Sequence, residues 1–229
     1  MVFSQKLESL YKLKVEVFLF SQFILLFGSL VLPGQTLEQH IFSLFYSFNI
    51  ATGLLITLKK KMFRRIITVL LACSLTLLLL DAPVFPAVDR LVPQIVIYFV
   101  FHSIVAVVLI EQMLLTKDEN YRVVLGVLSG YISIGMVSFF LFILIEHMSP
   151  GSFKGLPVED VNSHSQEEAL MYAAFITLMT IGYGDIVPLT PIARKAAIIV
   201  GLAGQFYMVV LTAIIVGKFL KFREPHRKD

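Results

Sequence analysis

Long apolar stretches alternate with short polar segments along the whole chain. Six of them are long enough, or nearly so, to cross a hydrocarbon layer of roughly 30 Å as helices rising about 1.5 Å per residue. They lie at about 15–32, 40–58, 66–82, 92–115, 123–147 and 194–218. A seventh stretch, 169–179, is too short to span, and backbone that enters a membrane without crossing it must be buried in protein or line a wet cavity. The pattern therefore predicts an all-α membrane protein with six transmembrane helices and one re-entrant helix.

The composition supports this class. Of 229 residues, 57% are hydrophobic and 15% are charged, whereas soluble domains contain about 45–50% apolar and about 25% charged residues. These values exclude a disordered chain, a coiled coil and an ordinary soluble enzyme. The single cysteine, Cys73, excludes a disulfide framework within the chain and a multi-cysteine metal site.

The basic residues are distributed unevenly between the loops. Fifteen of the 19 Lys and Arg residues fall at the N-terminus, in the second and fourth loops and in the tail, which share one side if all six stretches span. The positive-inside rule then places both termini in the cytoplasm and predicts a multi-pass protein of the cell membrane. Because membrane topology accounts for these residues, the net charge of +3 does not indicate a nucleic-acid partner.

The re-entrant stretch ends in a short glycine-containing strip, Thr180-Ile181-Gly182-Tyr183-Gly184-Asp185. Placed between two spans, this strip resembles the TVGYG selectivity filter of the potassium-channel pore superfamily. The resemblance covers residues 123–218 and includes an outer helix, a pore helix at about 167–179, the filter and an inner helix. Residues 204–211 also resemble bacterial potassium channels that have six spans per subunit.

The resemblance implies a site for potassium ions. Their water shell would be replaced by the carbonyls of Thr180, Ile181, Gly182 and Tyr183, together with the Thr180 hydroxyl. Successive carbonyls point the same way only if the backbone alternates between right-handed and left-handed conformations. Glycine adopts the left-handed conformation, with positive φ, without steric cost, which explains Gly182 and Gly184. Four copies are needed to close a ring and the chain holds one. We therefore expect a homotetramer that passes potassium ions passively, is not an enzyme, and uses no other cofactor.

Further residues take expected roles from the same resemblance. Tyr172 supports the filter by bonding Asp185, or simply packs in the interior. Met179 replaces a Thr that is common in the family and faces the cavity below the filter. Gly204 occupies the position of the gating hinge, although glycine also serves close helix packing. Three residues recur every four positions and are expected to line the cavity and gate on one face: Met208, Thr212 and Val216.

The first four spans resemble those of voltage-gated channels in number only. Between Leu91 and Thr116 there is no Lys or Arg, whereas a voltage sensor needs several charges within the field. Each span instead carries a polar residue near its midpoint: Gln22, Asn49, Ser74 and His102. Since polar groups at this depth are normally paired, we expect a structural cluster in which Asn49 meets His102. A proton-sensing His102 is the alternative.

The chain thus divides into four segments. They are an amphipathic interfacial helix (1–14), a peripheral four-helix domain that does not sense voltage (15–122), a pore domain (123–218) and a short basic cytoplasmic tail (219–229). The expected partners are further copies of the chain and membrane lipids, with anionic lipids at the tail. Two other functions remain open: a regulatory membrane protein with a vestigial pore, and a secondary transporter, for which no inverted repeat is visible.

Overall fold

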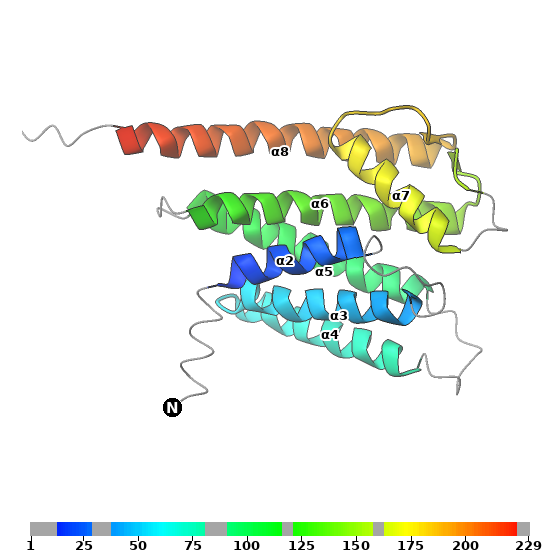
Figure 1. Ribbon diagram of the computed structural model, residues 1–229, viewed down its shortest axis with the longest axis horizontal. Helices are drawn as coiled ribbons and strands as arrows, with labels where there is room; N and C mark the ends of the chain where they lie inside the picture. Colours follow the sequence, from blue (N-terminus) through cyan, green and yellow to red (C-terminus); the bar gives the residue numbers. More distant parts are fainter. Residues whose placement is uncertain (1–12, 29–37, 81–90, 116–120, 158–162, 224–229) are drawn as a thin grey trace, which may run out of the picture.

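The computed structural model describes residues 13–28, 38–80, 91–115, 121–157 and 163–223. The expected interfacial helix and the end of the tail lie outside these residues. The helices are α2 (Lys14–Phe27), α3 (Glu38–Thr57), α4 (Lys61–Leu80), α5 (Leu91–Leu115), α6 (Tyr121–Met148), α7 (Ser163–Leu178) and α8 (Pro191–Arg223). Two short strands, β1 (Phe153–Lys154) and β2 (Val187–Pro188), complete the described elements (Figure 1).

Four helices are long and apolar enough to cross a membrane: Lys61–Leu79, Leu91–Leu115, Tyr121–Met148 and Pro191–Ala213. They coincide with the third to sixth predicted spans. In the region of the first two spans, α2 has 14 residues and α3 contains the shorter apolar stretch Leu44–Thr57. The architecture is therefore that of an all-helical membrane protein.

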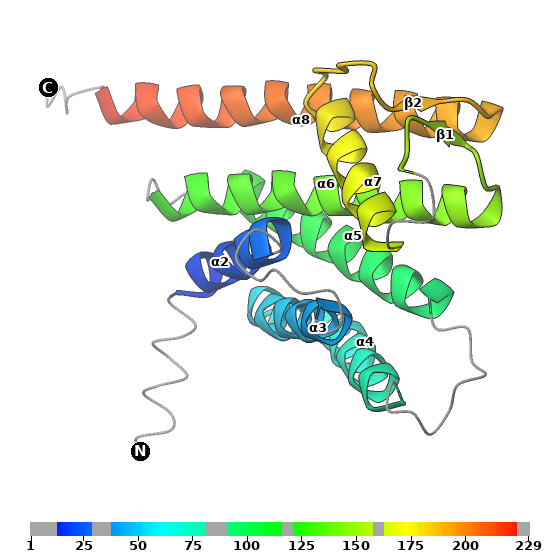
Figure 2. The same cartoon turned by 45° about the vertical axis from the view of Figure 1, so that its right-hand side comes forward.

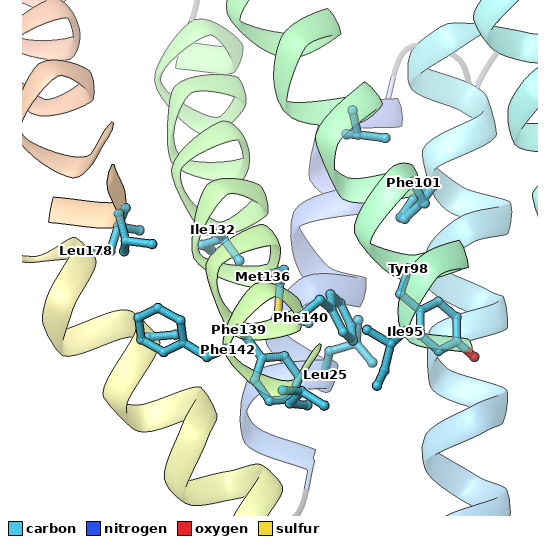
Figure 3. Packing of buried hydrophobic residues seen from close by; sticks show 14 of the residues in the cluster. Leu25, Ile95, Tyr98, Phe101, Ile132, Met136, Phe139, Phe140, Phe142 and Leu178 are labelled. Atoms are coloured by element: carbon cyan, nitrogen blue, oxygen red, sulfur yellow. The ribbon is translucent and has the colours of Figure 1, made fainter. Parts of the chain in front are cut away.

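Helix α6 lies at the centre of the fold. It packs against α2 and α5 on one side and against α7 and α8 on the other (Figures 1 and 2). One continuous hydrophobic core joins the two sides, with Phe101 of α5, Met136 of α6 and Leu178 of α7 all fully or almost fully buried (Figure 3). The peripheral helices and the segment that contains the strip are therefore packed as one unit.

The polar residues of the first four spans are buried, but the prediction that Asn49 meets His102 in one cluster is wrong. The Gln22 amide donates to the Ser129 carbonyl at 3.1 Å and to the Ser133 hydroxyl at 2.9 Å, both on α6. The Asn49 amide donates instead to the Ser21 hydroxyl on α2 at 2.8 Å. Helix rotation, which the packing of apolar neighbours decides, turns these side chains toward different helices.

Ser74 and His102 have separate surroundings as well. The hydroxyl groups of Ser74 and Ser47 are 3.0 Å apart. His102 is fully buried, and neither of its ring nitrogens has a hydrogen-bond partner within the described part of the chain. Its ring stacks instead on Phe140 of α6, with centroids 6.0 Å apart, and meets the edge of Phe101.

We expect the variant His102→Leu to unfold at a higher temperature than the native protein. A buried polar group without a hydrogen bond costs about 1–3 kcal/mol, and a leucine packs against Phe140 without that cost. The matched variant Gln22→Leu removes two hydrogen bonds to α6 and should lower stability by about 0.6–1.7 kcal/mol. Thermal unfolding of the detergent-solubilised protein measures both. A lower unfolding temperature for His102→Leu would contradict this reading.

Polar contacts tie the helix ends together where α5 ends and α6 begins. One carboxylate oxygen of Glu16 accepts hydrogen bonds from the Tyr121 hydroxyl and from Nε of Arg122, each at 3.0 Å. Lys60, between α3 and α4, forms an ion pair with Glu111 of α5. The first peripheral helix is thereby linked directly to the start of α6.

Candidate functional site

Helix α7 positions the strip. It slopes between α6 and α8 and ends at Leu178 against α8 (Figure 2). The chain then turns back on the last helical turn, because the amide of Thr180 donates to the Thr177 carbonyl at 3.0 Å and that of Ile181 to the Ile176 carbonyl at 2.9 Å. The strip therefore begins at the carbonyl end of a helix, where the negative end of the helix dipole favours a cation.

The backbone of the strip alternates between hands. Thr180, Gly182 and Gly184 have φ values of 57°, 56° and 82°, while the residues between them do not have positive φ. A Cβ added at Gly182 or Gly184 would meet no atom within 4 Å, so the backbone conformation, and not crowding, is what requires glycine there. Thr180 is the one described non-glycine residue at positive φ, a strain that is typical of functional sites.

Every residue of the strip from 180 to 185 is exposed in the single chain, and the Tyr183 side chain is 72% exposed. The neighbouring helix α8 also exposes large apolar side chains: Ile198, Ile199, Leu202 and Phe206 are each more than half exposed. The strip and this face of α8 are therefore both uncovered in the single chain.

Tyr172 of α7 and Asp185, the last residue of the strip, form a hydrogen-bonded pair. The hydrogen bond from the Tyr172 hydroxyl lowers the pKa of the Asp185 carboxyl, and backbone amides of Asp185 and Ile186 add to this effect. The same bond raises the pKa of the Tyr172 hydroxyl. The pair links α7 to the last residue of the strip and favours a negative charge there.

We expect the variant Tyr172→Phe to raise the pKa of the Asp185 carboxyl. The native hydrogen bond lowers this pKa, so the carboxylate persists to lower pH, and removing the hydroxyl lets it protonate at higher pH. An NMR titration of the carboxyl groups in the detergent-solubilised protein measures the shift. The control Asp185→Asn should remove the signal that moves, which assigns it to Asp185. An unchanged titration midpoint in Tyr172→Phe would contradict the pairing.

A small antiparallel ladder, absent from the sequence-based expectation, joins the loop after α6 to the segment that follows the strip. Phe153 pairs with Pro188, and Lys154 pairs with Val187. The Glu146 carboxylate at the end of α6 accepts hydrogen bonds from the amides of Gly151, at 2.6 Å, and Phe153, at 3.0 Å. The two glycines that flank Ser-Phe-Lys are the signal that would have indicated this turn and strand.

At Gly204, α8 lies very close to the end of α7. Gly204 is buried, and a Cβ there would lie 1.8 Å from the Leu178 carbonyl oxygen and 2.8 Å from the carbonyl carbon. Of the two roles considered for this glycine, the structure supports close packing. Because Leu178 is the last residue of α7, any side chain at position 204 would displace the start of the strip.

Of the other residues expected to line a cavity, Met179 lies between α7 and the strip, and Met208 and Thr212 lie in α8. Met179 and Met208 are 43% and 45% exposed, and the Thr212 hydroxyl donates to the Met208 carbonyl at 2.9 Å. The side chain of Val216 lies outside the described residues. The single chain therefore leaves both methionine side chains uncovered.

Comparison with known proteins agrees with this geometry. Residues 158–221, which include α7, the strip and most of α8, match a family described as "Ion channel". The two-pore potassium channel 5 of Arabidopsis thaliana is 33% identical over 88 residues, which make up 37% of this chain. The chain spans 21% of that protein's length. No solved structure matches the chain at a significant level.

The region that contains the strip is thus similar to the pores of ion channels, and the two matches support a relationship to the potassium-channel pore family. They point to a channel and not to an enzyme. Together with the four membrane-length apolar helices, they support a transmembrane protein that takes part in ion transport.

Proposed function

We propose that the chain is the subunit of a homotetrameric potassium channel, through which potassium ions cross a cell membrane passively and selectively. The observation that carries this proposal is the alternation of positive φ at Thr180, Gly182 and Gly184, directly after the carbonyl end of a non-spanning helix. Such a backbone directs successive carbonyl oxygens to one side, where they replace the hydration shell of an ion. Thr180, Ile181, Gly182 and Tyr183 would supply these oxygens.

The open sides of the site support assembly from four copies. A ring of oxygens around an ion requires several strips to face one axis, and the exposure of residues 180–185 leaves them available for this. The exposed apolar side chains of α8, among them Ile199 and Phe206, would then pack against neighbouring subunits. In this assembly each chain contributes six transmembrane helices, with both termini in the cytoplasm.

Ion flux through the purified full chain in liposomes tests the proposal. We expect vesicles loaded with potassium to lose it at least ten times faster than matched vesicles lose sodium, and empty vesicles to lose neither. Flux without selectivity, or no flux from a protein that is folded and tetrameric, would overturn the proposal. The second outcome is the one expected of a regulatory membrane protein with a vestigial pore.

We expect the open probability to depend only weakly on voltage. Helix α5 contains no Lys or Arg between Leu91 and Leu115, so no row of positive charges in it can move through the field. Each charge that crosses contributes about 2.3 kcal/mol per 100 mV. Single-channel recording in planar bilayers between about −100 and +100 mV should give a slope equivalent to about one elementary charge or less. A slope of several charges would reveal a sensor elsewhere in the chain.

A further inference from the structure

Two exposed methionines lie next to the end of α7. Met179 follows Leu178, the last residue of this helix, and stands directly before the strip. Met208 lies on α8, and both side chains are exposed. Met113 and Met136, in contrast, are buried in the apolar interior. The side chains of Met179 and Met208 are therefore accessible in the single chain.

The packing of α8 on α7 brings these two side chains to the same place. Gly204 of α8 faces the end of α7, because a Cβ there would lie 1.8 Å from the Leu178 carbonyl oxygen. Met208 follows four residues later, on the same face and about 6 Å further along the helix. Helix α8 continues past the end of α7 (Figure 2), so α7 leaves this face of α8 exposed at Met208. Both methionines therefore extend from the immediate surroundings of one carbonyl group.

Sulfur is the metal-binding atom that the side chains of these two helices offer here. Helix α8 contains no Asp, Glu, His or Cys, and α7 contains none after Glu168. Thioether sulfur is neutral and polarisable, and it selects soft cations such as copper(I) over hard ones. The carbonyl end of α7 lies at the same place and favours a cation. Because neutral ligands do not offset a second charge, the two methionines suit a soft cation that carries one charge.

We propose that Met179 and Met208, with their counterparts in neighbouring subunits, bind a soft monovalent cation directly below the strip. The ion is copper(I), or silver(I), which has the same charge and similar softness. The site rests on the proposed function, since one chain supplies two sulfur atoms and four chains around one axis supply eight. A cation held by them occupies the path of potassium ions and blocks it.

Silver binding to the detergent-solubilised full chain tests the site. The protein carries the substitution Cys73→Ser, because Cys73 is an exposed thiol that would itself bind silver, and nitrate replaces chloride so that silver stays in solution. We expect X-ray absorption at the silver edge to show sulfur neighbours. Met179→Leu and Met208→Leu, which keep an apolar side chain of similar volume, should each weaken silver binding at least tenfold in equilibrium dialysis.

The matched control removes a sulfur atom elsewhere. Met148, the last residue of α6, is even more exposed than Met179 and lies away from the strip, so Met148→Leu should leave the affinity for silver unchanged. Zinc, which prefers thiolate, imidazole and carboxylate ligands, should bind equally to Met179→Leu and to its parent. Unchanged silver affinity in folded tetramers of the double variant Met179→Leu, Met208→Leu would overturn the proposal. It would indicate that neighbouring subunits cover these methionines.

Potassium flux from liposomes in nitrate buffer tests the position of the site in the ion path. Silver, added on both sides of the membrane, should reduce the flux of the Cys73→Ser protein at least tenfold. Met179→Leu should require at least ten times more silver for the same fractional block, relative to its own flux without silver. Met148→Leu should require no more silver than its parent. Silver binding that depends on both methionines but leaves flux unchanged would overturn the placement of the site in the ion path.

The two measurements together separate this proposal from the channel function. If tetramers bind silver through sulfur and both leucine variants weaken that binding, while no potassium crosses the membrane, the channel function fails and the thioether site stands. If potassium crosses selectively, silver does not reduce the flux and binding is the same in the leucine variants, the channel function stands and the thioether site is refuted.

Discussion

Potassium-selective flux is expected to disappear when Gly182 is replaced by alanine, while the tetramer still assembles. Gly182 has φ of 56°, and a Cβ there would meet no atom within 4 Å of the same chain. The substitution therefore acts through the backbone and not through a collision. The left-handed conformation costs an L-residue about 1–2 kcal/mol, and a tetramer incurs that cost four times around one ring. Relaxation of the backbone would turn a carbonyl away from the ion path.

Flux in liposomes, with cross-linking to count subunits, measures this outcome. The matched control is Gly151→Ala, since Gly151 also has positive φ, at 81°, with no atom within 4 Å of an added Cβ. Gly151 lies in the loop between α6 and β1, away from the strip. The control variant therefore has the same unfavourable backbone conformation at another place and should keep selective flux. If the Gly182→Ala protein still conducts potassium selectively, residues 180–184 do not form the ion path. Equal losses in both variants would indicate a general folding defect.

The longest elements and the strip were predictable from the sequence for physical reasons. A span needs about 20 apolar residues in a row, and four such helices appear where the apolar stretches lie. The short helix before the strip was predictable because its apolar stretch is too short to cross a membrane and ends at the strip. Its observed start at Ser163 is earlier than the apolar pattern indicated, since the first helical turns are polar.

The partners of polar residues were not predictable, because they depend on how each helix is rotated about its axis. Gln22 and Asn49 lie at similar distances along their spans, yet one faces α6 and the other faces Ser21 of α2. The β1–β2 ladder was also missed, since strands of two residues are too short to show an alternating pattern. The hydrogen bond between Tyr172 and Asp185 was one of the two expectations that the family resemblance left open for Tyr172, the other being simple packing.

The role of Gly204 could not be decided from its residue type, because hinges and close helix contacts both favour glycine. We expect Gly204→Ala to lower potassium flux at least tenfold and to reduce the selectivity of what remains. The added Cβ would lie 1.8 Å from the Leu178 carbonyl oxygen, which belongs to backbone and cannot rotate away. The end of α7 must then shift, and with it the start of the strip at Thr180.

A second glycine on the same helix provides the control for this last prediction. Gly201 lies close to one turn before Gly204, and a Cβ there would meet only the Thr177 carbonyl oxygen, at 3.9 Å. This is an ordinary contact, so Gly201→Ala should retain flux, selectivity and unfolding temperature. Gly204→Ala should in addition lose about 1–3 kcal/mol of stability, as is typical of overpacked interiors. If Gly204 acts only as a hinge, its alanine variant will open less often but will keep both its ion selectivity and its unfolding temperature. That result would show that the contact with Leu178 does not determine the geometry of the strip.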